Sequence, residues 1–449
     1  GILHRWKYLP DEHKLNLDKV FPVLSNTLKP ELGIRFDVPD LTNRYPKYHK
    51  EITGFYTKYL DNDIFRKIIP LAKTGFVTRT GNEFEIIHGD SNKLQFGKGI
   101  GKEPKTDLKK LGPCRPVPAP NNVKFFFIYQ EADKPLMEKL KEYFLKGYKY
   151  HPNMQDFIHQ TFSFDESLDI AFDSTDTSVK SIWENIKDRI KEPDTKYLAV
   201  YISPVFKYEP NYERRRIYYR IKEMLLTNGY LSQVIFKDNI AKDAFNYFLP
   251  NIQIAMLAKL GGIPWRLNRE PNDELIVGIG AFYSVTRKTR YVGSAFCFNN
   301  EGEFKGFECF GSADTISLAG SVREAVDKFL KANKKATRLI IHFYKLISKK
   351  ELKPILDTLY NKLDLQIPVI VVTINKTASK ELLSFDMSSD GLMPYSGTYI
   401  KVGEREYLLF NNTRYDETSK PTPKEHHFPV KIKLTSTQLE LLEEKELID

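Results

Sequence analysis

The sequence predicts an α/β protein with two layered domains behind an irregular N-terminal segment. Two patterns and the chain length predict this fold class. Between residues 123 and 262, short apolar runs alternate with amphipathic segments. From residue 274 onward, three strand-like runs come first, and helix and strand then alternate. A chain of 449 residues is also unlikely to form a single core, so two or three domains are expected.

The N-terminal segment, residues 1–112, is rich in Pro, Lys and Asp, with a helix-like pattern at 48–72. The stretch 94–122, "LQFGKGIGKEPKTDLKKLGPCRPVPAPNN", is dense in Gly and Pro, and we expect a linker there. Its "GKGIGK" differs from a phosphate-binding loop, because three residues separate the outer glycines and Glu103 stands where Ser or Thr is needed. We assign no site to it.

The first predicted domain, residues 113–262, alternates strand and helix patterns. The predicted strands are 123–130, 167–174, 197–204 and 230–236. The predicted helices are 134–150, 178–190, 212–229 and 251–262. Buried strands that alternate with amphipathic helices are typical of a parallel sheet with helices packed on it.

The second predicted domain, residues 263–449, begins with β-rich sequence. "ELIVGIGAFYS" (274–284) and "RYVGSAFCFNNEGEFKGFECF" (290–310) predict three consecutive strands. Helices at 318–333 and 349–363 then alternate with strands at 338–345 and 368–375, and a hairpin is expected over 397–412. This order of strands and helices is that of the ribonuclease-H fold. The tail "STQLELLEEKELID" has a helical pattern.

Composition indicates a basic protein of the cytoplasm. Lys and Arg number 68 against 58 acids, and the excess of +10 is spread along the chain, which suits a polyanionic ligand or, equally well, a solvated surface. Neither a transmembrane run nor a secretory signal is expected. Cys114, Cys297 and Cys309 are few and distant, which argues against disulfides. His426 and His427 point to opposite faces of one strand, so no metal site is predicted.

Four residues of the first domain form a candidate binding site. Tyr218 and Lys222 lie four residues apart, and so on one face of a helix. Gln233 lies in the next strand, and Lys259 ends the following helix. A Tyr–Lys pair alone is usually a solvated helix edge, but this full order is much less expected by chance. Two ammonium groups, an amide and a ring suit a terminal nucleotide, with charge for its 5′-phosphate and a face for its base.

Three stretches resemble Argonaute proteins. "YYRIKEMLLTNGYLSQVIF…NIQIAMLAKLGGIPW" resembles the MID domain and its junction to PIWI, "GLMPYSGTYIKVGEREYLLFNNTRYDE…HHFPVKIKL" resembles the late PIWI segment of prokaryotic members, and "LQFGKGIGKEPKTDLKKLGP" resembles the segment before MID. The resemblance spans about residues 94–435, without a PAZ domain ahead of it. It implies a Rossmann-like MID domain (113–262), a ribonuclease-H-like PIWI domain (263–449), and a linker, APAZ-like or L2-like segment (1–112).

The resemblance also implies roles for individual residues. Tyr218, Lys222, Gln233 and Lys259 match the residues that hold the guide's 5′-phosphate and first base. Mg²⁺ at that phosphate is the cofactor to consider, although the position of a glutamine that assists the ion is Ala255 here.

The PIWI domain is predicted to be catalytically inactive. Active Argonautes carry an Asp where this chain has Gly280 and a second where it has Tyr344. Two-metal cleavage needs carboxylates to hold the ions, and Glu308 and Asp314 cannot replace both. We therefore predict no catalytic residue and no metal in this domain, and no enzyme activity.

Together these features imply a prokaryotic Argonaute of the short, PAZ-lacking kind. It would hold a 5′-phosphorylated guide, RNA rather than DNA, and recognise a complementary single-stranded target, DNA, without cleaving it. An APAZ-containing effector with a TIR, sirtuin-like or nuclease module would respond, in defence against plasmids or phage. Three alternatives stay open: an endonuclease with a non-standard active site, a scaffold that no longer binds nucleic acid, and the C-terminal portion of a longer inactive Argonaute, since the chain begins without Met.

Overall fold

A computed structural model describes most of the chain between residues 32 and 437. The described ranges are 32–33, 42–71, 75–80, 84–87, 93–189, 191–268, 274–284, 289–298, 304–306, 309–311, 314–333, 337–375, 382–415 and 428–437. The chain divides into two compact units. One comprises Gly1–Thr78, Ser384–Pro394 and Asn412–His427, and the other comprises Arg79–Leu383, Tyr395–Asn411 and Phe428–Asp449.

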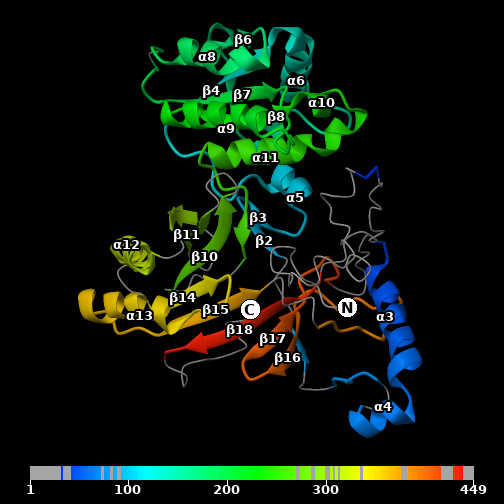
Figure 1. The fold of residues 1–449 in the computed structure, drawn as a ribbon. Helices are drawn as coiled ribbons and strands as arrows, with labels where there is room; N and C mark the ends of the chain where they lie inside the picture. Colours follow the sequence, from blue (N-terminus) through cyan, green and yellow to red (C-terminus); the bar gives the residue numbers. More distant parts are fainter. Residues whose placement is uncertain are drawn as a thin grey trace, which may run out of the picture. The chain divides into compact units, whose positions relative to one another are not determined.

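A parallel five-stranded sheet in the order β5-β4-β7-β8, with β6 also on β4, forms the first α/β layer (Figure 1). Its strands are β4 (Asn122–Gln130), β5 (Ser163–Phe164), β6 (Ile170–Phe172), β7 (Thr195–Ser203) and β8 (Leu231–Phe236). The predicted parallel sheet is therefore confirmed. The strand expected at 167–174 is shorter, because η7 (Glu166–Leu168) occupies its first residues.

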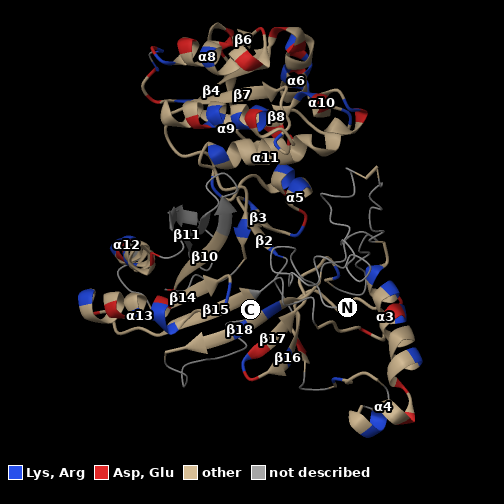
Figure 2. Cartoon of the chain, in the orientation of Figure 1, with Lys and Arg blue, Asp and Glu red and all other residues tan. Residues whose placement is uncertain are grey.

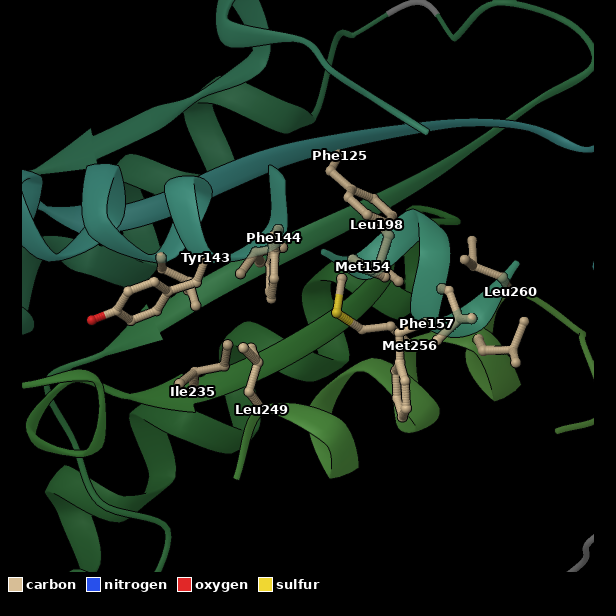
Figure 3. Close-up of a cluster of buried hydrophobic side chains, with 14 of the residues drawn as sticks. Phe125, Tyr143, Phe144, Met154, Phe157, Leu198, Ile235, Leu249, Met256 and Leu260 are labelled. Atoms are coloured by element: carbon tan, nitrogen blue, oxygen red, sulfur yellow. The ribbon is translucent and has the colours of Figure 1, made fainter. Parts of the chain in front are cut away.

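Helices pack on both faces of this sheet. They are η6 (Glu131–Asp133), α6 (Lys134–Lys146), α7 (Met154–Ile158), α8 (Thr175–Ile186), α9 (Tyr212–Thr227), α10 (Lys237–Ile240), η8 (Asp243–Tyr247) and α11 (Leu249–Lys259). Phe125 belongs to the core with α6 and α11, whereas the next residue, Phe126, belongs to the core with α8 and α9. Successive strand residues point to opposite faces, so β4 contributes to both cores. Figure 3 shows part of the core that contains Phe125 and residues of α6 and α11.

The helix expected over 134–150 ends at Lys146 because of Gly147. Gly147 has a φ of 86°, and a Cβ at this position would collide with the carbonyl oxygen of His151. Only glycine adopts this conformation without a steric penalty, so the chain leaves the helix here.

The stretch 94–122, expected to be a linker, is structured instead. It contains β2 (Leu94–Phe96), β3 (Gly99–Gly101) and α5 (Pro104–Leu111). β2 pairs with β3 and with β9 (Arg266–Leu267), a strand distant in sequence. Phe96 and Leu108 are buried in the core of the first layer. The sequence prediction of a linker was wrong because this order depends on distant contacts, whereas the Gly-rich pattern marks only the hairpin turn.

A ten-stranded mixed sheet forms the second layer, in the order β1-β16-β17-β18-β15-β14-β10-β11-β12 with β13 on β11. Its strands are β1 (Phe84–Ile86), β10 (Glu274–Ser284), β11 (Thr289–Phe298), β12 (Phe304–Gly306), β13 (Cys309–Gly311), β14 (Arg338–Phe343), β15 (Val369–Asn375), β16 (Thr398–Gly403), β17 (Glu406–Leu409) and β18 (Val430–Ser436). β10 runs antiparallel to β11 and parallel to β14, as the ribonuclease-H strand order predicts.

Three helical segments follow the β-rich part of the second layer. They are α12 (Thr315–Asn333), α13 (Lys349–Asp357) and η9 (Thr358–Lys362), and they contribute to a core with β10, β14 and β15. In the other unit, α3 (Arg44–Phe55), η3 (Tyr56–Leu60) and α4 (Asp63–Ile68) account for the helical pattern at 48–72. Among the described helices, none combines the length and apolar composition needed to span a membrane.

Candidate functional site

A cavity of about 290 Å³ lies at the carboxyl edge of the first sheet. Its walls come from the end of β7 and the residues after it, from β8, α9 and α10, and from η8 and α11. The lining residues are Ser203, Val205, Phe206, Lys207, Tyr218, Gln233, Val234, Ile235, Phe236, Asn239, Phe245, Phe248, Asn251, Ile252 and Ala255. The carboxyl edge of parallel strands is the usual ligand-binding edge of α/β proteins.

The structure brings the four predicted site residues together. Tyr218 and Gln233 line the cavity. Lys259 Nζ donates hydrogen bonds to Gln233 Oε1 and to the Ser232 carbonyl oxygen, both at 2.7 Å. Lys222 Nζ lies 5.7 Å from the centre of the Tyr218 ring and acts electrostatically on Lys259. The spacing on α9 and the parallel order of β7 and β8 together account for this convergence.

Lys222 and Lys259 place two ammonium groups beside the cavity, and no ion pair with an acid is found for either of them among the described residues. Much of the Lys259 side chain is exposed, yet the pKa of Lys259 is lowered to about 8. The larger cause is the protein packed around its ammonium, and the smaller cause is repulsion from Lys222. No Asp or Glu is among the residues that line the cavity. An anion bound beside these lysines would relieve their repulsion and stabilise the charged form of Lys259.

Several cavity residues were missed by the sequence reasoning. Lys207, Asn239 and Asn251 bring polar side chains to the cavity, and the exposed Phe206 and Phe248 bring aromatic rings. The sequence offers one signal for Phe206 and Lys207, because "SPVFKYEPN" comes directly after a predicted buried strand. Residues at such strand ends meet at one edge of the sheet, which makes them candidates for ligand contacts.

The residues present do not fit a Mg²⁺ ion in this cavity. Mg²⁺ prefers carboxylate oxygens in near-octahedral geometry, whereas the lining offers lysine, amide, hydroxyl and apolar groups. Ala255 lines the cavity and supplies only a methyl group. Within the described ranges, no group of three or more His, Cys, Asp or Glu residues forms a metal site. His426, His427 and Glu308 lie outside the described residues.

Gly280 and Tyr344 occupy neighbouring positions in the second layer. β10 and β14 are parallel, and Ile279 opposite Phe343 is their last pair, so Gly280 and Tyr344 are the residues that directly follow this pairing. The pairing of β10 with β11 shifts register between Ile279 and Gly280, and a Cβ built on Gly280 meets no atom within 4 Å. The Tyr344 ring stacks on Phe343 at 5.2 Å.

Asp314, one of the two acids considered as replacements for the missing carboxylates, has a structural role. Its side chain accepts a hydrogen bond from the Ser317 backbone N–H at 2.8 Å at the start of α12, and another from the Ser317 hydroxyl. These bonds hold the pKa of Asp314 below its usual value. The carboxylate therefore serves to cap the helix.

Comparison with known proteins gives consistent matches. The Piwi domain model matches residues 210–439, about half of the chain. A Piwi protein of Archaeoglobus fulgidus is 22% identical over 374 residues, which cover 76% of this chain and 75% of that protein. The protein argonaute of Cereibacter sphaeroides is 28% identical over 207 residues, covering 42% of this chain and 26% of that protein.

Solved structures of low sequence identity share the fold. The Marinitoga piezophila Argonaute in complex with a 5′ OH guide RNA and target DNA matches with a TM-score of 0.59 and 14% identity, over 92% of this chain and 61% of that one. Drosophila Piwi matches with a TM-score of 0.53 and 15% identity, over 81% and 49%. The chain thus spans about a quarter of the Cereibacter protein and about three fifths of the Marinitoga protein.

Proposed function

Because this chain belongs to the Piwi-domain family, whose members compared above are Argonaute and Piwi proteins, we propose that it binds a guide strand by its 5′ end. The guide then pairs with a complementary target strand. The observation that carries the proposal is the convergence of Tyr218, Lys222, Gln233 and Lys259 at one cavity. Sequence recognition would then depend on base pairing.

Each wall of the cavity suits one part of a 5′-terminal nucleotide. Lys222 and Lys259 provide charge for a terminal phosphate, and Gln233, which lines the cavity, is hydrogen-bonded to Lys259. Tyr218 and the apolar walls provide surface for the first base. The Marinitoga complex contains guide RNA and target DNA, which supports the same pairing of strands here.

A comparison of 5′ ends tests this function directly. Wild-type protein is expected to bind a short strand with a 5′-phosphate about tenfold or more tightly than the same strand with a 5′-hydroxyl, because charge-assisted hydrogen bonds contribute roughly 1.5–3 kcal/mol. Lys222→Ala should remove most of this preference. The measurement is fluorescence anisotropy with RNA and DNA at two salt concentrations, since phosphate contacts weaken as salt rises.

The comparison also separates the alternatives. Equal, weak binding of both ends that Lys222→Ala leaves unchanged would contradict the proposal and favour a scaffold without nucleic-acid binding. A preference for the hydroxyl end would instead assign the apolar cavity to a non-phosphorylated terminus, as in the guide of the Marinitoga complex.

We also propose that the paired target is not cleaved. The support is the chemistry of two neighbouring positions, where Gly280 within β10 and Tyr344 directly after β14 carry no carboxylate. Incubation of the guide-loaded protein with labelled target and Mg²⁺ or Mn²⁺ should leave the target intact. Metal-dependent cutting at one position set by the guide would refute this and favour an endonuclease with other acids.

A protein that binds without cutting needs a partner to produce a biological response. We propose an APAZ-containing effector with a TIR, sirtuin-like or nuclease module that responds to target pairing in defence against plasmids or phage. Such a partner, co-expressed with this chain, should co-purify and become active only with guide and matched target present. Activity that is independent of the target would contradict this role.

A further inference from the structure

A second surface adjoins the cavity and shares only Lys207 with its lining. We define it as the aromatic–basic face, made of Lys207 and Tyr208 after β7 and of Tyr212, Arg215 and Tyr219 on α9. The three α9 residues are spaced three and four apart and so share one side of the helix. Tyr208 is 66%, Tyr219 56% and Tyr212 40% exposed. Three large exposed rings grouped in this way are characteristic of a binding surface.

The face is continuous with the cavity wall. Phe206 lines the cavity and packs edge-on against Tyr208, with ring centres 5.4 Å apart. Lys207 also lines the cavity, and its side chain lies near both Tyr218 and Tyr219. The Tyr218 and Tyr219 rings contact each other at 5.1 Å. A strand whose end lies in the cavity would therefore reach this face without a gap.

The charge of the face suits a polyanion. The α9 sequence YERRRIYYRIKEMLLT carries five Arg or Lys residues and two Glu residues. Figure 2 shows the basic positions along this helix. Arg216 pairs with Glu213 at 3.3 Å, and no ion pair with an acid is found for Arg215 within the described part of the chain. The Arg215 and Arg216 guanidinium groups lie 5.9 and 5.8 Å from the centre of the Tyr212 ring.

We propose that the aromatic–basic face binds a short run of unpaired nucleotides of a single strand. Bases stack on Tyr208, Tyr212 and Tyr219, while Lys207 and Arg215 contact phosphates. Aromatic rings interleaved with basic side chains are the arrangement that binds single strands with little sequence preference. The inference goes beyond the proposed function, because binding of a 5′ terminus requires the cavity alone.

Strand length separates the face from the cavity. The variant Tyr208→Ala/Tyr212→Ala/Tyr219→Ala should bind a 5′-phosphorylated strand of about 12 nucleotides roughly tenfold or more weakly than wild type, since each stacked base contributes about 1–3 kcal/mol. Its affinity for a 5′-phosphorylated mononucleotide should change less than about twofold, because the terminal nucleotide alone is proposed to occupy the cavity and has no further base to stack on the face. Arg215→Ala should reduce the salt dependence of long-strand binding by about one ion.

The matched control is Tyr150→Ala. Tyr150 is 96% exposed on the same domain, but the neighbouring Lys149 is neutralised by Asp243 at 2.7 Å. This variant should bind the long strand and the short 5′-phosphorylated ligand with wild-type affinity. All variants should melt at the wild-type temperature. The inference would be overturned by any of three results. The triple variant could keep its affinity for the long strand, Tyr150→Ala could lose as much affinity as the triple variant, or polyglutamate could displace the strand as efficiently as poly(dT). A missing 5′-phosphate preference in wild type would instead count against the proposed function.

Discussion

Replacing Lys259 with methionine is expected to weaken binding of a 5′-phosphorylated strand by about 100-fold, the upper range for a hydrogen bond to a charged group. Methionine keeps an unbranched, apolar stem but removes the ammonium that donates to Gln233 Oε1 and the Ser232 carbonyl oxygen. Gln233 then loses one of the two hydrogen bonds that orient its amide and keeps the one from Nε2 to the Val234 carbonyl oxygen at 3.1 Å. Binding of a 5′-hydroxyl strand should change less than about threefold, because that end has no dianion to contact.

The same substitution should remove a pH dependence. The pKa of Lys259 is about 8 in the free protein. A phosphate dianion raises this pKa, so the bound state holds more protons than the free state, and affinity falls as pH rises through 8. Affinity should also fall below about pH 6, where a phosphate monoester loses its second charge. The wild-type optimum therefore lies between these values.

Isothermal titration calorimetry between pH 5 and 10 measures the affinity and the proton uptake together. Lys146→Met is the matched control, since Lys146 is exposed and paired with Glu142 at 3.0 Å, and its profile should equal that of wild type. If wild-type affinity stays constant between pH 7 and 9, Lys259 is not a phosphate ligand.

Glu274→Ala is expected to lower the free energy of unfolding of the second layer by about 3–5 kcal/mol. Arg338 Nε donates to Glu274 Oε2 at 2.6 Å between the parallel strands β10 and β14, where the two residues are in register. Their side chains are 17% and 7% exposed. Removing the Glu274 carboxylate takes a 2.6 Å hydrogen bond away from the largely buried Arg338 guanidinium. Breaking a buried ion pair is costly because the remaining charge is then less well compensated than before.

Urea unfolding followed by fluorescence measures this loss. The control is Asp327→Ala, which removes an exposed contact of 3.8 Å with Arg323 on α12 and should cost less than about 1 kcal/mol. A loss below about 1 kcal/mol for Glu274→Ala as well would show that water reaches the Arg338–Glu274 pair.

Site residues could be predicted from the sequence where their placement depends on local spacing, and not where it depends on contacts between residues distant in the sequence. Tyr218 and Lys222 share a face because of helical spacing alone, and Gln233 and Lys259 follow in the next two elements. Their convergence was therefore predictable from order and periodicity. Lys207 follows a buried parallel strand and could have been expected at this edge of the sheet. Asn239 and Asn251 could not, because they reach the cavity through the packing of α10 and α11.

The sequence by itself determined the order of the elements, the parallel first sheet, and the lack of carboxylates at Gly280 and Tyr344, since hydrophobic period and residue identity are local properties. Only the tertiary structure decided that 94–111 is folded, because β2 pairs with the distant β9. It also decided the lowered pKa of Lys259, which depends on the protein packed around its ammonium and on the nearby charge of Lys222. Cavities and pKa values arise from contacts between distant residues, which no local pattern records.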